Sequence, residues 1–124
     1  MKKGRKPIDY EIDVKTVLVD MVEAAQPHLT KGGAKASSFA SHEFAQYIKD
    51  IQHVDEMVEK GQLTPTEAQF LVDQYKLSMQ AVLLTVEGLG VIAVQGAINA
   101  ALTVLNNALS AALGATFKSL KFAI

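Results

Sequence analysis

The sequence predicts an all-α protein: two shorter amphipathic helices, then a long and nearly charge-free C-terminal helix, packed together as a helical bundle. Apolar residues recur at three- and four-residue steps along most of the chain, which is the period of a helix with one buried face. No stretch alternates β-branched and polar residues in the way typical of a strand. A length of 124 residues without cysteine corresponds to one domain, residues 1–124, with no disulfide framework.

The first helix is predicted over residues 13–26. Apolar residues at helical spacing line one side of it: Val14, Val17, Leu18, Met21, Val22 and Ala25. Pro27 should end this helix, because a proline disfavours the helical conformation of the residue before it. The following TKGGAKASS, residues 30–38, is interpreted as a loop in which Gly32 and Gly33 remove steric restraint.

The second helix is predicted over residues 38–60. Its apolar face contains Phe44, Tyr47, Ile48, Ile51, Val54, Met57 and Val58. Gly61 is well placed to stop it. The next helix has the clearest start signal of the chain, because Thr64 and Glu67 have the spacing of a capping box and Pro65 suits the first helical position.

From that start, the apolar pattern continues to residue 113. We therefore expect one continuous or gently kinked helix over residues 65–113, about 70 Å long at the usual rise per residue. Gly88 and Gly90 lie in its middle and weaken a helix there. The alternative is two helices that turn at these glycines and pack antiparallel.

The C-terminal stretch, residues 83–115, carries one charged side chain, Glu87. At 100° per residue its side chains fall on three faces. The first, here called the polar stripe, contains Gln95, Asn99, Thr103, Asn106 and Ser110. The second, the large-residue ridge, contains Val91, Ile98, Leu102, Leu105 and Leu109. The third, the small-residue strip, contains Gly90, Ala97, Ala101, Ala108, Ala112 and Ala115.

The ridge and the strip are predicted to form an oligomer contact. Small residues let another helix approach closely, and two shorter helices would leave much of a helix about 70 Å long uncovered. Glu87, isolated among apolar residues, is interpreted as the partner of a lysine on a neighbouring copy.

No catalytic, cofactor-binding or metal-binding residue is predicted, and we expect no enzyme. His42 and Glu43 stand in HEFAQ, which lacks the second histidine of a zinc-protease motif. Asp50, His53 and Glu56 lie one helical turn apart and could hold a metal. We interpret these three as an exposed polar face instead.

The N-terminal segment, residues 1–12, is predicted to be basic and mobile, with Lys2, Lys3, Arg5 and Lys6 in its first six residues. Its alternative role is contact with phosphate, in nucleic acid or in lipid headgroups. A secretory signal needs an apolar stretch directly after its basic start, and acidic residues stand there instead. We therefore expect a protein that is not exported by that route. A location in the cytoplasm or within a virus-like particle is favoured, and membrane association is the alternative.

Three function classes follow. The first is a non-enzymatic structural subunit that self-assembles into a ring, tube, filament or virus-particle component, with copies of itself and with other subunits as partners. The alternative is a membrane-active pore of holin or ejection type, because residues 88–117 carry no charge and are long enough to span a bilayer. Against it, the stretch holds four carboxamides, which are costly in hydrocarbon. The third class is a small helical adaptor or regulatory bundle.

Overall fold

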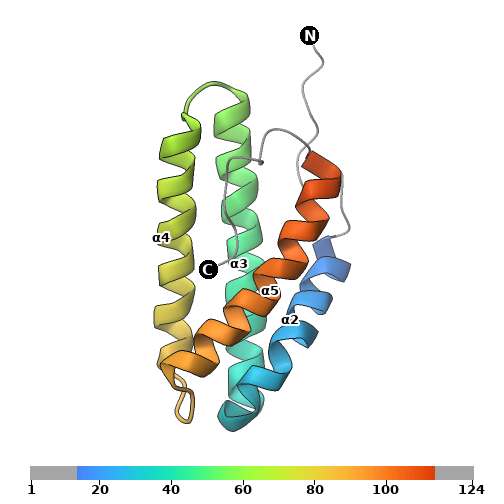
Figure 1. Cartoon of the computed structure of the whole chain (residues 1–124), viewed down its shortest axis with the longest axis vertical. Helices are drawn as coiled ribbons and strands as arrows, with labels where there is room; N and C mark the ends of the chain where they lie inside the picture. The colour runs from blue at the N-terminus through green and yellow to red at the C-terminus, as the bar shows by residue number, and fades with distance from the viewer. Residues whose placement is uncertain (1–13, 114–124) are drawn as a thin grey trace.

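The chain folds as a bundle of α-helices in a computed structural model, which describes the backbone of residues 14–113 and the side chains of residues 14–108. Within that range it contains no strand, and the all-α prediction is confirmed (Figure 1). The elements are α2 (Val14–Leu29), the 3-10 helix η1 (Thr30–Gly32), α3 (Gly33–Glu59), α4 (Pro65–Leu84) and α5 (Val91–Leu113).

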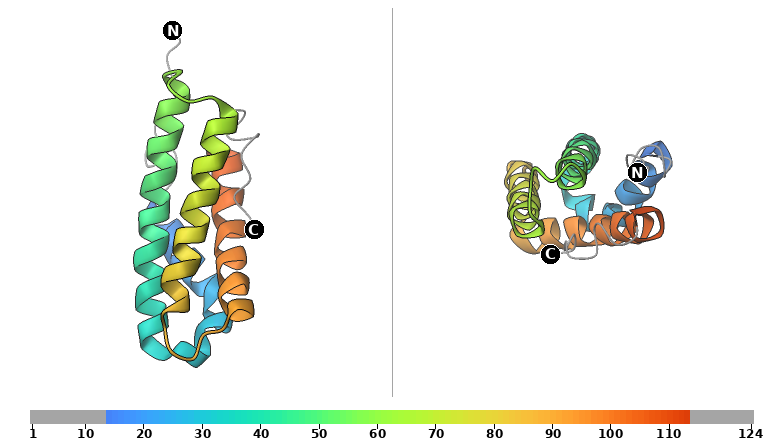
Figure 2. Two further views of the ribbon diagram at one scale, coloured as in Figure 1. Left: turned by 90° about the vertical axis from the view of Figure 1, so that its left-hand side faces the viewer. Right: turned by 90° about the horizontal axis from the view of Figure 1, so that it is seen from above.

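The bundle consists of two antiparallel helix pairs. Helices α3 and α4 form one pair, and α2 and α5 form the other, as the view along the bundle shows (Figure 2, right). The contact between α2 and α5 is the most extensive of all, and the contact between α4 and α5 is much smaller. Both links between the pairs, η1 and residues 85–90, lie at the same end of the bundle (Figure 1, bottom). We call this the lower end.

The α2–α3 connection is shorter than the sequence suggested. Helix α2 continues through Pro27 to Leu29, so the prediction that Pro27 ends it is wrong. A proline in the last turn removes only one backbone hydrogen bond of the helix, and the fully buried Leu29 anchors that turn in the core. The predicted loop over residues 30–38 is also wrong beyond residue 32, because the buried Ala36 extends the core face of α3 toward its start.

The turn between α3 and α4 follows the local signals closely. Gly61 has a φ of +74°, a conformation that favours glycine, and its N–H donates to the Val58 carbonyl at 3.0 Å. The capping box is confirmed: the Glu67 N–H donates to Thr64 Oγ1 at 3.1 Å, and the Thr64 N–H donates to Glu67 Oε1 at 2.9 Å.

The predicted continuous helix over residues 65–113 is wrong, and the alternative of two helices with a turn at the glycines is confirmed, although α5 packs mainly against α2 and not against α4. Helix α4 ends at Leu84 and α5 begins at Val91. Gly88 turns the chain with a φ of +95°. Val86 and Leu89, which made the segment look helical, point into the core and are buried. An apolar turn is stable here because its apolar side chains are covered by the bundle itself.

One hydrophobic core holds the helices together. All four contribute to it, and its largest fully buried side chains are Met21, Leu29, Phe44, Tyr47, Ile48, Ile51, Leu83, Ile98, Leu102 and Leu105. Because three of these belong to α5, the apolar side of the charge-free helix is occupied within a single chain.

Candidate functional site

The side of α5 predicted to contact another copy lies largely inside the bundle. Five of its residues are fully buried: Ala97, Ile98, Ala101, Leu102 and Leu105. A second copy cannot reach them while the bundle is closed, so the predicted oligomer contact is wrong for these positions. The reason is the turn at Gly88, which folds α5 back and supplies the missing neighbours from the same chain.

The other predicted contact residues divide into two groups. Gly90 and Val91 are exposed at the lower end, and Ala108 is half-buried. Leu109 and Ala112, together with Ala115, lie outside the described side chains, as does Ser110 of the polar stripe.

The polar stripe lies on the outer side of α5. Gln95 and Thr103 are exposed, and Asn99 and Asn106 are half-buried. Thr103 Oγ1 donates to the Asn99 carbonyl at 2.9 Å, one turn earlier in the same helix. Since α5 contains no charged residue, this face offers neutral donors and acceptors to whatever lies outside the bundle.

His28 has a role that sequence analysis missed. It follows Pro27, after which the sequence predicts no helix, but it lies in the last turn of α2, and its ring packs against α5 at Gly96. A Cβ atom on Gly96 would lie only 2.6 Å from His28 Nδ1. Nothing in the sequence pairs these residues, because the contact depends on α2 and α5 being neighbours.

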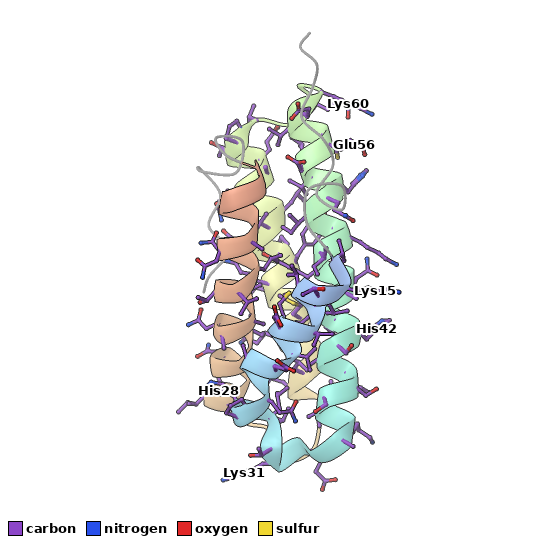
Figure 3. All side chains as sticks on the ribbon, turned by 90° about the vertical axis from the view of Figure 1, so that its right-hand side faces the viewer. Lys15, His28, Lys31, His42, Glu56 and Lys60 are labelled. Carbon is purple, nitrogen blue, oxygen red and sulfur yellow. The ribbon has the colours of Figure 1, made fainter. Side chains whose placement is uncertain are left out.

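Apolar side chains are exposed at the lower end of the bundle. Ile92 is 87% exposed and Val91 is 50% exposed. Ile92 lines a surface hollow together with His28, Lys31 and other residues at the end of α2. Figure 3 shows His28 and Lys31 at this end, while Glu56 and Lys60 lie at the opposite one.

A buried phenol lies among carboxylates between α3 and α4. The Tyr47 side chain is buried, and its hydroxyl has no hydrogen-bond partner among the described residues. Burial, and then the carboxylates of Asp73 and Asp50, strongly raise the pKa of Tyr47. Burial and Asp50 also raise the pKa of Tyr75. Both phenols therefore stay neutral at neutral pH, which makes them unsuited to act as bases or nucleophiles.

Two of the three residues considered as metal ligands make simple surface interactions. Asp50 accepts a hydrogen bond from Gln46 at 3.1 Å, and Glu56 lies 3.7 Å from the ammonium of Lys60. The described residues contain no group of three His, Cys, Asp or Glu side chains that could hold a metal. The Ser37 hydroxyl is hydrogen-bonded to Gln26 of α2.

Two further predictions concern charged residues. Glu87 is exposed in the turn before α5, and it forms no ion pair with any other described residue. Its pairing with a lysine of another copy stays a prediction. The basic residues Lys2, Lys3, Arg5 and Lys6 lie outside the described residues, and their contact with phosphate also stays a prediction.

The surfaces therefore define a helical bundle with one uncharged outer helix face and one apolar end. Comparison with protein-family models, with curated proteins and with solved structures found no match.

Proposed function

We propose that this protein is a non-enzymatic structural subunit that associates with copies of itself through the outer face of α5. The observation that carries the proposal is the polar stripe, which stands on a helix with no charged residue and faces away from the core. The exposed sides of α2 and α3, in contrast, carry charges such as Lys15, Glu23 and Lys49.

A face of this kind suits contact between identical surfaces. A carboxamide both donates and accepts hydrogen bonds, so Gln95 and Asn99 of one copy can pair with the same residues of another. In a symmetric contact, a charged residue near the axis would meet its own like charge, which is destabilising. The stripe avoids that repulsion. We therefore propose the polar stripe as the contact surface in place of the buried ridge and strip. The assembly formed is a ring, tube, filament or particle component.

A membrane-active function is the second candidate, because α5 passes the length and composition requirements of a membrane span over Val91–Ala108. Only 33% of that window is buried in the bundle. Burial in the core therefore explains why one side of α5 carries no charge. It does not explain why the outer side carries none. In lipid, the amides of the stripe would need partners on neighbouring helices or line a water-filled pore.

The mass of the protein in solution, measured by light scattering with and without detergent, tests the first proposal. We expect a detergent-independent oligomer. Gln95→Lys combined with Thr103→Lys should yield a monomer with nearly unchanged melting, since both side chains are exposed. The matched control is Gln74→Lys on the exposed side of α4, which should leave the oligomer intact.

Three other outcomes separate the alternatives. A wild-type monomer at every concentration would contradict self-association and would favour the adaptor class. Dye release from liposomes by the wild type would support the membrane-active candidate, and its absence would count against that candidate. An oligomer that Gln74→Lys dissociates and the stripe variant does not would place the contact on α4.

A further inference from the structure

We propose that the lower end of the bundle is a docking surface for an anionic lipid membrane, with Val91 and Ile92 entering the headgroup region and Lys31 and Lys35 facing lipid phosphates. This surface lies at the start of α5 and the start of α3, at the end where both links between the helix pairs lie (Figure 1). It adjoins the polar stripe, because Gln95 lies one helical turn after Val91 and Ile92 on the same face of α5.

The apolar part of the surface is the first turn of α5. Ile92 is the most exposed large apolar side chain of the described residues, and Val91 next to it is half exposed. Residues of the same segment, Val86 and Leu89, are buried in the core. The fold thus buries some apolar side chains of this segment and leaves adjacent ones in water, where their exposure is unfavourable. Transfer into the boundary of a bilayer removes that cost.

The charge of the lower end complements an anionic surface. Residues 27–42 and 80–96, which lie nearest this end, contain Lys31 and Lys35 and one acid, Glu87, and the acids Glu23 and Glu43 lie just beyond them. Both lysines are exposed. Lys31 lines the same hollow as Ile92, so a cation stands beside the apolar tip.

The opposite end of the bundle is acidic. Four acids and one lysine of residues 50–67 reach the surface: Asp50, Glu56, Glu59, Glu67 and Lys60, while Asp55 is buried. Figure 3 shows the ends apart, with Lys31 at one and Glu56 and Lys60 at the other. An anionic membrane attracts the lower end and repels the upper one, which orients the bundle with Ile92 toward the lipid.

The shape of the surface favours lipid over other occupants. A protein partner would need a pocket matched to the protruding Ile92, whereas a fluid bilayer adapts to it. A soluble phosphate would engage the lysines but would leave Val91 and Ile92 in water. Lipid accounts for both the apolar pair and the cations.

Binding of the full chain to vesicles tests the proposal. We expect binding to vesicles of equal parts phosphatidylcholine and phosphatidylserine, and weaker binding to phosphatidylcholine alone. Lys31→Gln with Lys35→Gln should weaken binding about fivefold per lysine, and Val91→Ser with Ile92→Ser should weaken it about tenfold. Two matched control variants should bind as the wild type does. They are Phe70→Ser with Leu77→Ser on α4, and Lys15→Gln with Lys49→Gln. Phe70 and Leu77 are 62% and 59% exposed, so they match the apolar pair in exposure.

A fluorescent label shows which surface meets the lipid. The chain has no cysteine, so Ile92→Cys carries a single environment-sensitive dye, with Lys60→Cys as the matched position at the acidic end. We expect a blue shift on anionic vesicles for the dye at 92 and none at 60. The shift should persist when Lys2, Lys3, Arg5 and Lys6 are all changed to Gln, because the proposed surface does not include the N-terminal segment.

The results that would overturn the proposal are distinct from those that bear on self-association. The absence of vesicle binding, or binding that the lower-end variants leave unchanged, would overturn it. A shift at position 92 that disappears in the N-terminal variant would do so too. Mass in solution depends on the stripe and is measured without lipid, so either proposal can fail alone.

Discussion

The ring of His28 packs directly against the α5 backbone at Gly96, where a Cβ atom would lie 2.6 Å from Nδ1. This contact joins the last turn of α2 to the second turn of α5, within the most extensive helix contact of the bundle. A side chain at position 96 and the imidazole cannot both keep their places.

The first prediction is a coupling between these two positions. Gly96→Ala in a His28→Ala background should stabilise the protein by about 1 kcal/mol, the helix propensity of alanine over glycine. In the presence of His28, the clash should reduce or reverse that gain. Urea unfolding of the wild type, both single variants and the double variant gives the coupling free energy. Additive effects would show that the ring does not occupy this site.

The second prediction tests the turn between α4 and α5. Gly88→Ala should destabilise the protein by about 1–2 kcal/mol, because alanine disfavours a positive φ and its Cβ would overlap the Lys31 carbonyl oxygen. Gly90→Ala is the control, since Gly90 has open space around it and no positive φ. The sign of the change is diagnostic, because a continuous helix would be stabilised by both substitutions. Thermal or urea unfolding measures it.

Sequence analysis predicted well those features whose cause is local. The capping box at Thr64 and the glycine stop at Gly61 depend only on residues within one turn, and both are confirmed. The helical period likewise reflects each helix's own buried face. The side of α5 that holds its polar stripe was also evident, because neutral polar residues recur there every three or four positions.

The errors arose where distant segments decide the structure. Val86 and Leu89 continue an apolar helical pattern, but they are buried as turn residues against the start of α3. The Lys31 carbonyl lies so close to Gly88 that no side chain fits there, and this contact between distant segments is not visible in the sequence. Once the chain turns, the ridge of α5 becomes core. The sequence indicated correctly that Leu102 and its neighbours pack closely against other helices. Those helices belong to the same chain and not to another copy.

The third prediction tests whether the small-residue strip packs within one chain and not between copies. Ala101→Leu should lower the free energy of unfolding by about 1–3 kcal/mol, because Ala101 is fully buried and the core has to accommodate a larger side chain. Ala100→Leu, at the neighbouring half-buried position, should cost much less. The effect should be independent of protein concentration. A loss of stability that grows on dilution would instead indicate a contact between copies at Ala101.

The last prediction concerns the buried hydroxyl of Tyr47. Burial and the carboxylates of Asp73 and Asp50 oppose its ionisation, and it has no hydrogen-bond partner among the described residues. An unsatisfied buried hydroxyl costs about 1–3 kcal/mol. Tyr47→Phe should therefore be neutral or stabilising at neutral pH, unlike most core substitutions.

The pH dependence of that variant gives an independent check. Burial raises the pKa of Tyr47 in the folded state far above its ordinary value near 10. Well below pH 10 the phenol is neutral in both the folded and the unfolded chain, so it adds no pH dependence to stability. As the pH rises past about 10, the unfolded chain loses the proton and the folded chain keeps it, so stability falls. Tyr47→Phe should flatten this alkaline loss, measured by urea unfolding across that range. An equally steep loss in the variant would show that other groups cause it and that Tyr47 ionises freely in the fold.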